Sequence, residues 1–278
     1  MGQIIEGTVT AVCISEEKGT LKHDVGKAMI LDGYGIENDA HGGDWHRQIS
    51  LLSEKSIKKM VDMGLEVFPG IFAENITVQG IDLPKLPIGA WLWIGEDVIL
   101  EVTQIGKECH AGCAVFEQVG MCIMPTEGIF AKVIKGGEVQ RGSAVKAGFP
   151  VKSAILTISD KGFSGERIDL SGEVIEKEVK SIGTVIGKEI VADEYDSIVK
   201  ELKRMSDELD ADVIFTTGGT GLGPRDITPE ATVAVVDKLV SGIPTAMLLG
   251  GLKNTPHAML SRAVAGVRKE TLIINLPG

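Results

Sequence analysis

The chain has 278 residues, which exceeds the usual size of one hydrophobic core, so we expect two domains of about 130 to 150 residues each. Acidic residues outnumber basic ones 39 to 28, which gives a net charge of −11, and no Lys/Arg run is long enough to follow a nucleic-acid backbone. Nucleic acid is therefore excluded as the expected partner. An anionic ligand would have to be held by local features such as backbone N–H groups, helix N-termini or a bound cation.

The N-terminal residues 1–6 contain neither the basic nor the apolar segment of a secretory signal. The most apolar stretch, residues 231–252, is interrupted by Asp237, Lys238 and Pro244, so it is not expected to span a membrane. We therefore expect a cytoplasmic protein whose four cysteines are thiols rather than disulfides.

The first half of the chain, residues 1–148, is rich in short segments with strand character that are separated by Gly, Asp and Pro. The expected strands are 7–14, 28–31, 76–78, 91–94 and 98–102. Residues 53–63 have helical spacing instead, with Ser53 as the N-cap and Gly64 as the stop. The pattern predicts a mostly-β domain, either a small barrel or a sandwich.

The second half, residues 152–278, alternates strands with helices after a boundary placed in residues 147–152. The expected strands are 154–158, 184–191, 213–216 and 271–275, and the expected helices are 172–181, 197–209, 228–239 and 256–267. Such alternation predicts an α/β domain with a mostly parallel sheet covered by helices.

One turn of this second domain has the composition of an anion-binding loop. Residues 216–226 read Thr-Thr-Gly-Gly-Thr-Gly-Leu-Gly-Pro-Arg-Asp and follow a predicted strand, which is where open parallel sheets bind ligands. The glycines let backbone N–H groups approach a phosphate, and a helix with Thr228 as N-cap and Pro229 at its first position follows. Arg225 could contact the phosphate and Asp226 a bridging cation. Taken alone, a glycine-rich turn is equally consistent with a structural role.

Residues 217–232 resemble the signature of the molybdopterin adenylyltransferase family, which includes bacterial enzymes and the G domains of gephyrin-like proteins. Further matching segments are 156–160, 169–172, 258–262 and 273–278. Together they follow the order of the family across most of residues 152–278.

The resemblance implies that the terminal phosphate of molybdopterin attacks the α-phosphorus of ATP, with magnesium neutralising charge. It implies that Asp226 and Asp193 are catalytic and hold the metal. The residues that it places at the cofactor and ATP are Ser159, Asp160, Gly218, Gly219, Thr220, Gly221, Arg225, Ser261, Pro277 and Gly278. Local sequence also allows Asp160 and Asp169 to be turn or cap residues, and Asp193 to be a solvated acid at a helix start.

The chain departs from the family pattern in two places. Gly251 stands where related sequences commonly have a serine that could contact the pterin or phosphate. The family pattern also continues past Pro277 and Gly278 into a further loop and a long final helix. A chain that stops there is expected to lack part of the wall of the site and to leave one sheet face uncovered. Relatives form trimers or larger assemblies, so the resemblance implies a homo-oligomer.

The first domain contains three clustered cysteines, Cys109, Cys113 and Cys122. A thiol beside Lys107 and His110 should ionise more readily than one in an apolar core, which suits a sulfur carrier or nucleophile. Zinc binding by the three cysteines and His110 is the alternative, although the second closely spaced ligand pair is missing. Cys13, in a strand-like segment, is expected to be a small buried hydrophobic residue.

Segments 38–43, 105–109 and 127–137 resemble MOSC domains, named for the C-terminal part of molybdenum-cofactor sulfurases. The resemblance implies a β-barrel with a pterin-cofactor pocket and a reactive cysteine, assigned first to Cys109, with Cys113 and Cys122 as alternates. His41 and His46 lie among Gly and Asp and are expected to be turn residues rather than ligands. The side chains considered for orienting a pterin and its phosphate are Asp39, Lys107 and Arg141.

The leading hypothesis is therefore an enzyme of molybdenum cofactor biosynthesis. Its C-terminal domain would adenylylate molybdopterin with Mg-ATP, and its barrel would handle sulfur or the sulfurated cofactor. Other cofactor-biosynthesis proteins are additional expected partners. A protein that carries the pterin cofactor without turning over ATP is the alternative, and a third hypothesis makes the barrel only a zinc-bound scaffold.

Overall fold

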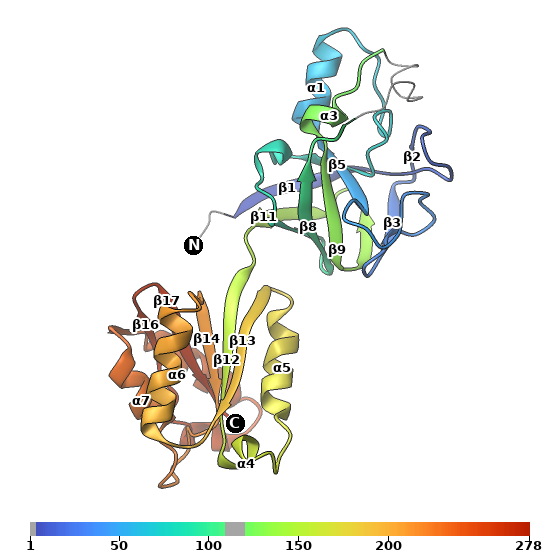
Figure 1. Cartoon of the computed structure of the whole chain (residues 1–278). Coiled ribbons are helices and arrows are strands. Elements are labelled where there is room, and N and C mark those ends of the chain that lie inside the picture. The colour runs from blue at the N-terminus through green and yellow to red at the C-terminus, as the bar shows by residue number, and fades with distance from the viewer. Residues whose placement is uncertain (1–3, 109–119) are drawn as a thin grey trace. The chain divides into compact units, whose positions relative to one another are not determined.

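A computed structural model describes residues 4–108 and 120–278. The chain divides into two compact units, Met1–Phe149 and Pro150–Gly278, each with its own hydrophobic core (Figure 1). Within the described ranges, no helix is long and apolar enough to cross a membrane.

The N-terminal unit is built on a closed β-barrel. Its strands are β1 (Ile5–Ile14), β5 (Ile49–Ser53), β6 (Ile76–Gln79), β7 (Trp91–Ile94), β8 (Val98–Ile105), β9 (Ile129–Lys135) and β11 (Ala144–Gly148). They follow the order β11-β7-β8-β9-β5-β6-β1, and antiparallel pairing of β1 with β11 closes the sheet and removes its edges. All neighbours are antiparallel except β5 and β6. The residues that point inward, mostly Val, Leu and Ile, form one core.

Shorter elements lie outside the barrel wall. Strands β10 (Gly137–Gln140), β3 (Lys27–Leu31) and β4 (Gly35–Ile36) form a small separate sheet, and β2 (His23–Asp24) pairs with the end of β1. Helices α1 (Glu54–Asp62) and α3 (Met124–Glu127) and the 3-10 turn η1 (Leu83–Lys85) join the strands. A second apolar cluster, which includes Phe72, Met124 and Phe130, lies beneath the helical segments.

The expectations for this unit are largely confirmed. The five expected strands are present as β1, β3, β6, β7 and β8, and α1 begins after Ser53, whose side chain accepts a hydrogen bond from the Ser56 N–H. Gly64 adopts a left-handed φ of 90° directly after the helix. Strands β5, β9 and β11 of the barrel were not predicted. All five residues of β5 are buried, so it lacks the alternation that marks a half-exposed strand.

The C-terminal unit is an α/β domain with a mixed six-stranded sheet in the order β13-β12-β14-β17-β16-β15. Strands β12 (Val151–Ile158), β13 (Gly183–Val191), β14 (Val213–Thr217) and β17 (Thr271–Leu276) are parallel, whereas β16 (Ala265–Arg268) and β15 (Lys238–Leu239) are antiparallel to their neighbours. Helices α6 (Tyr195–Asp207) and α7 (Thr228–Val235) share a core with one face of the sheet. Helix α5 (Leu170–Val179) contacts β12, β13 and β14 (Figure 1).

The mixed sheet corrects two expected helices. The helix predicted for residues 256–267 is a 3-10 segment, η2 (Pro256–Leu260), followed by an extended stretch and β16. The helix predicted for residues 228–239 ends at Val235, and β15 then pairs with β16. Short apolar runs fit a helix or a buried strand equally well, and here pairing of β16 with β17 in the tertiary structure decided between them. Helix α8 (Gly242–Gly251) was not predicted, nor was the short α4 (Asp160–Phe163).

Cys13 provides a test of the barrel core. Its side chain is fully buried on β1, as expected from the sequence, and burial together with the Glu74 and Asp24 carboxylates raises the pKa of its thiol to about 12. We expect iodoacetamide at pH 8 to leave Cys13 unmodified in the native protein and to alkylate it after denaturation in urea. Peptide mass spectrometry would measure the modification, with the half-buried Cys122 as internal reference. Alkylation of native Cys13 as fast as Cys122 would contradict the packing.

Candidate functional site

The glycine-rich loop begins where β14 ends and turns back at once. Gly218 and Gly219 adopt left-handed φ values of 95° and 63°. A Cβ atom at Gly218 would lie 2.2 Å from the carbonyl oxygen of Ile158, and one at Gly219 would lie 2.3 Å from Oγ1 of Thr228. Any other residue would therefore suffer both backbone strain and a steric clash, so these two glycines fix the path of the loop.

The loop presents backbone donors that the protein does not use. Within the described part of the chain, the N–H groups of residues 219–222 have no hydrogen-bond acceptor. The loop is closed instead by the Thr228 N–H, which donates to the Gly219 carbonyl at 3.1 Å, and by the Thr228 hydroxyl, which donates to the Gly218 carbonyl at 2.9 Å. Thr228 is thus the first residue of α7 rather than its predicted N-cap, a position held by Ile227. The Thr228 hydroxyl stabilises the turn because the path of the chain at Gly218 and Gly219 brings the Gly218 carbonyl within hydrogen-bond distance of it.

Arg262 supports the far side of the loop. Its backbone N–H donates to the Thr220 carbonyl at 2.9 Å, and its Nε donates to the Gly221 carbonyl at 2.8 Å. The same guanidinium reaches the Asp226 carbonyl and the Glu230 carboxylate. Arg262 was not among the predicted site residues, although it belongs to the matching segment 258–262. Its role depends on contacts across 32 to 42 residues of chain, which a linear pattern does not show.

Two carboxylates flank the loop. Asp226 Oδ2 accepts a hydrogen bond from the Gly223 N–H at 2.7 Å, and Asp193 Oδ2 accepts one from the Asp160 N–H at 2.8 Å. The Oδ1 atom of Asp193 lies 3.5 Å from the position that a Cβ on Gly219 would take. Burial and the neighbouring carboxylates of Asp160 and Asp226 raise the pKa of Asp193 above its usual value. The structure thus brings Asp193 and Asp226, 33 residues apart in sequence, to the same loop.

Arg225 is already engaged by protein carboxylates. Its guanidinium donates two hydrogen bonds of 2.8 Å to Asp160 and one of 3.0 Å to Glu194. The bidentate contact lowers the pKa of Asp160. In this arrangement Arg225 braces the pair of turns that carry Asp160 and Asp193, whereas the sequence suggested a direct phosphate contact.

Ser159 and Asp169 act as helix caps. The Ser159 hydroxyl accepts from the Gly162 N–H at the start of α4, and Asp169 accepts from the Gly172 N–H at the start of α5. Asp169 also accepts a hydrogen bond of 2.8 Å from the Thr157 hydroxyl. A cavity of about 110 Å³ lies beside them and extends to Gly218 and Gly278. Three of the cofactor residues expected from the sequence, Ser159, Gly218 and Gly278, therefore line the same cavity.

Ser261 and Pro277 line a second cavity of about 340 Å³, formed with α8 and η2. Gly251 lies in its wall, where a Cβ atom would be only 2.9 Å from Cβ of Ala258. The close approach of α8 to η2 gives a packing reason for glycine at the position where the family pattern has serine.

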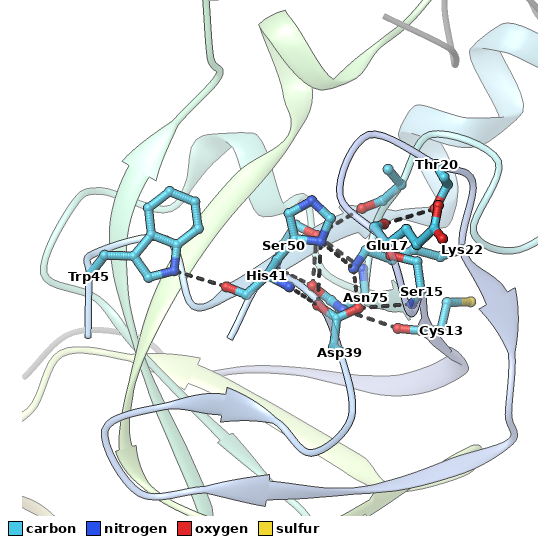
Figure 2. Close-up of polar contacts among 11 residues, drawn as sticks. Cys13, Ser15, Glu17, Thr20, Lys22, Asp39, His41, Trp45, Ser50 and Asn75 are labelled. Carbon is cyan, nitrogen blue, oxygen red and sulfur yellow. Dashed lines mark hydrogen bonds and ion pairs between the residues drawn. The ribbon is translucent and has the colours of Figure 1, made fainter. Parts of the chain in front are cut away.

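The N-terminal unit contains a buried charged cluster of Lys22, Asp39 and His41 (Figure 2). The Lys22 ammonium lies 2.5 Å from Asp39 Oδ1 and 3.2 Å from Nδ1 of His41, and the side chains of Lys22 and Asp39 are each only 1% exposed. Asp39 also accepts hydrogen bonds from the backbone N–H groups of Ser15 and His41, at 2.9 and 3.2 Å. His41 is therefore a turn residue, as expected, whose side chain also contacts a buried ion pair.

Burial and charge act in opposition in this cluster. Burial by itself would raise the pKa of Asp39, but hydrogen bonds from His41, Lys22 and Ser15 outweigh it and hold that pKa far below its usual value. For Lys22 burial dominates, and its pKa is lowered although Asp39 opposes the shift. Each charge is compensated by the other, and for Asp39 also by His41 and the Ser15 N–H.

The remaining residues considered in this unit are scattered. His46 lies 2.9 Å from the Gln104 side chain and is exposed, and Arg141 forms an ion pair with Asp24. Cys109, Cys113 and His110 lie outside the described residues, and Cys122 is half-buried beside the second apolar cluster. Among the described residues, no group of three or more His, Cys, Asp or Glu side chains is arranged to hold a metal ion.

Comparison with known proteins gives both units a family. Residues 154–278 match the family model of a probable molybdopterin binding domain, and residues 37–146 match that of the MOSC domain. Over 127 residues the chain is 46% identical to the molybdopterin adenylyltransferase of Helicobacter pylori J99, a match that covers 45% of this chain and 72% of that enzyme. The chain belongs to the molybdopterin adenylyltransferase family. It is therefore assigned to molybdenum cofactor biosynthesis, as expected from the sequence.

Other relatives match the same C-terminal domain. The molybdopterin adenylyltransferase of Escherichia coli K12 is 36% identical over 131 residues, which cover 46% of this chain and 67% of that enzyme. Gephyrin of Dictyostelium discoideum is 42% identical over 135 residues, 45% of this chain and 19% of gephyrin. The crystal structure of the molybdopterin biosynthesis enzyme MoaB of Thermus thermophilus is 50% identical, with a TM-score of 0.44 over 46% of this chain and 81% of that one.

The steric role of Gly218 in this member of the molybdopterin adenylyltransferase family can be tested by comparing its substitution with that of a matched glycine, Gly165. Gly218→Ala should cost about 1–2 kcal/mol for the left-handed backbone plus about 1–3 kcal/mol for the clash with Ile158. Gly165 has a similar φ of 78° but open space around it, so Gly165→Ala should incur only the first cost. Calorimetry would measure the stability of the C-terminal domain in both variants. Tryptophan fluorescence is unsuitable because the three tryptophans lie in the N-terminal unit. Equal losses would contradict the close approach of Gly218 to Ile158.

The buried ion pair gives a second test. Lys22→Met should lower the free energy of unfolding of the barrel by about 3 to 5 kcal/mol, because it leaves Asp39 buried without its counter-charge. Lys27→Met, which removes the exposed pair with Glu138, should cost less than about 1 kcal/mol. Urea unfolding followed by tryptophan fluorescence measures both variants.

The pH dependence of that test follows from the lowered pKa of Asp39. An Asp with a depressed folded-state pKa contributes stability above its unfolded pKa of about 3.9, and the contribution is lost only as pH falls through the lower folded value. Wild type should therefore keep this contribution from pH 7 to pH 5, whereas burial without Lys22 raises the pKa of Asp39 in the variant and protonation at lower pH relieves part of its penalty. The difference between wild type and Lys22→Met should narrow from pH 7 to pH 5, and a difference that grew over this range would contradict the cluster.

Proposed function

We propose that the C-terminal domain adenylylates molybdopterin with Mg-ATP, using the glycine-rich loop at residues 218–223 to hold phosphates. The observation that carries this proposal is a set of backbone N–H groups, at residues 219–222, that have no acceptor among the described residues and lie between the carboxylates of Asp193 and Asp226. Backbone donors in consecutive left-handed turns form a concave anion site, and the N-terminus of α7 adds a positive partial charge. The domain thereby gains a local attraction for phosphate despite the net charge of −11.

The two carboxylates fit a magnesium ion. Asp193 and Asp226 each use Oδ2 to accept a backbone hydrogen bond, and in the described part of the chain Oδ1 of neither has a donor. Magnesium is typically held by one or two carboxylates together with substrate phosphates, so two acids suffice where a protein-only metal site would need more. Bound there, the ion would neutralise charge on the transferring phosphates.

The other residues of the site position these groups. Arg262 fixes the carbonyls of Thr220 and Gly221, which orients the loop N–H groups toward the space that a phosphate would fill. Arg225 holds Asp160, whose backbone N–H in turn orients Asp193. Since adenylyl transfer depends chiefly on positioning and charge neutralisation, the site requires no separate general base.

For the barrel we propose handling of sulfur or of the sulfurated cofactor, with Cys109 as carrier and Cys113 or Cys122 as alternates. The match of residues 37–146 to the MOSC domain supports this role. A carrier that holds pterin cofactor without turning over ATP remains the alternative for the chain as a whole.

We also propose that the C-terminal domain self-associates through α8. The helix is strongly apolar, yet none of its residues is buried in the single chain. Leu248, Leu249 and the nearby Leu239 and Leu252 are all exposed. Contact between copies of the chain would remove this surface from water. Sedimentation analysis would measure the assembly, and a monomer at micromolar concentration would contradict it.

The proposed activity is tested by pyrophosphate release from molybdopterin, ATP and magnesium. Asp226→Asn should reduce the rate by about a hundredfold or more, because it removes a negative metal ligand from the phosphate site. Glu178→Gln, which neutralises an exposed acid on α5, is the matched control and should leave the rate unchanged. Release that survives Asp226→Asn would overturn the assigned metal site. No release by the wild type, with pterin still bound, would favour the carrier.

A further inference from the structure

The turns after three neighbouring parallel strands carry the acidic residues of the candidate site. Asp160 follows β12, Asp193 follows β13 and Asp226 lies in the loop after β14. In the sheet, β12 lies between β13 and β14 (Figure 1). The two proposed metal ligands, Asp193 and Asp226, therefore come from strands that do not pair with each other.

Strand spacing alone would keep these two carboxylates apart. Strands two positions apart in a sheet are separated by about 10 Å, whereas two oxygen ligands of one magnesium ion lie within about 4 Å of each other. The loops beyond the strand ends must therefore bring Asp193 and Asp226 together. Oδ1 of Asp193 lies 3.5 Å from the Cβ position of Gly219, and Oδ2 of Asp226 lies 2.8 Å from the Cβ positions of Gly221 and Gly223. Both acids thus converge on the same short segment of the loop.

Reciprocal hydrogen bonds join the turns after β12 and β13. The Asp160 N–H donates to Oδ2 of Asp193 at 2.8 Å, and the Asp193 N–H donates to Oδ1 of Asp160 at 3.0 Å. Each aspartate side chain therefore holds the backbone of the other residue. The two turns cannot separate without breaking both bonds, so Asp193 has a fixed position relative to Asp160.

Arg225 joins the loop after β14 to these two turns. Its Nε and Nη2 each donate to Asp160 at 2.8 Å, and Nη2 also donates to Oε1 of Glu194 at 3.0 Å. Glu194 directly follows Asp193 in the chain, and Arg225 directly precedes Asp226. The contact between Glu194 and Arg225 therefore links the two dipeptides that carry the proposed metal ligands. A guanidinium suits this place because its rigid fork of donors can hold two carboxylates in a fixed geometry.

These contacts contribute little to folding. The side chains of Asp160, Arg225 and Glu194 are 46%, 54% and 61% exposed. Exposed ion pairs stabilise a fold only weakly, because water already solvates both charges. The Arg225 guanidinium nevertheless lowers the pKa of Asp160, so this carboxylate is ionised and the contact persists at neutral pH. An effect of the contacts on the spacing of the metal ligands can therefore be measured in variants that still fold.

We propose that the ion pair of Glu194 with Arg225 is a clamp that sets the spacing of the Asp193 and Asp226 carboxylates, with Asp160 as its middle member. Glu194, which was not among the predicted site residues, is thus a positioning residue for the metal site. The clamp also gives Arg225 a role other than direct contact with phosphate. This inference rests on the proposed metal site and adds the contact that fixes its dimensions.

Two simpler roles for Arg225 predict different results. If it acted only as a positive charge, Arg225→Ala would bind a divalent cation more tightly, because the variant removes a repulsion. If it contacted phosphate instead, Glu194→Ala would release the guanidinium and would not weaken binding. The clamp predicts that both variants bind the cation about tenfold more weakly, as expected for residues that orient metal ligands. Since both substitutions break the same contact, the double variant should lose no more affinity than either single variant.

The test is Mn²⁺ binding to the full chain in the presence of α,β-methylene-ATP, followed by electron paramagnetic resonance of the free ion. Mn²⁺ takes the same oxygen ligands as Mg²⁺, and the methylene group prevents adenylyl transfer, so the measurement does not depend on activity. Glu194→Gln, which keeps an oxygen that can accept from Arg225, should recover part of the affinity lost in Glu194→Ala. Thermal unfolding of these variants should stay within about 3 °C of wild type.

The control variant is Asp210→Asn. It removes an exposed carboxylate from an ion pair with Lys152, at the opposite end of the same sheet, and asparagine tolerates the left-handed φ of 54° at this position. Its affinity for Mn²⁺ should equal that of wild type. Asp226→Asn removes a proposed metal ligand and should bind Mn²⁺ more weakly than either clamp variant.

The outcomes separate the clamp from the metal site itself. Weaker binding by both Glu194→Ala and Arg225→Ala, without further loss in the double variant, would support the clamp. Wild-type affinity in either variant, tighter binding by Arg225→Ala, or additive losses in the double variant would overturn it. Such a failure, with binding still impaired in Asp226→Asn, leaves the proposed adenylylation intact. Wild-type affinity in Asp226→Asn would overturn the metal site and the clamp together.

Discussion

The turn after β14 is the constraint on which the C-terminal site depends. The chain must reverse within two residues against the carbonyl of Ile158 and the hydroxyl of Thr228, and only glycine fits at 218 and 219. As far as the described residues go, that reversal leaves the N–H groups of residues 219–222 without acceptors and places them beside Asp193 and Asp226. A side chain at either glycine would shift the loop N–H groups away from Asp193 and Asp226 and would move the start of α7 with them.

The barrel also positions hydrogen-bond donors, which there belong to side chains and not to the backbone. There a buried Lys22–Asp39 pair contacts His41, and two aromatic rings pack against Arg47, which forms no ion pair within the described residues. In the part of the chain that the structure describes, both units thus contain donors without an acceptor. Because the global charge is strongly negative, such local donors are the means by which an anionic ligand can be bound at all.

The arginines illustrate why a residue type does not reveal its role. Arg225 stands in the motif itself, yet it pairs with Asp160 and Glu194 and braces two turns. Arg262 supports the loop from a distant segment, and Arg47 lines a pocket with no carboxylate among its described lining residues. These differences arise from which acidic side chains the fold brings within hydrogen-bond distance, so they could not be inferred from spacing along the chain.

The sequence by itself determined the two-part character of the chain, the strands with clear alternation, the capped helix after Ser53 and the glycine loop at the end of a strand. These features rest on local rules: period, caps and the backbone freedom of glycine. The tertiary structure decided what local rules leave open. Residues 265–268 became a strand because β17 offered a pairing edge, and Gly251 became a contact point because η2 packs against α8. His41 lies in a turn, as the sequence indicated, but its contact with Lys22 and Asp39 arises because folding buries these two side chains beside it. That arrangement is set by contacts between segments that have no fixed spacing in the sequence.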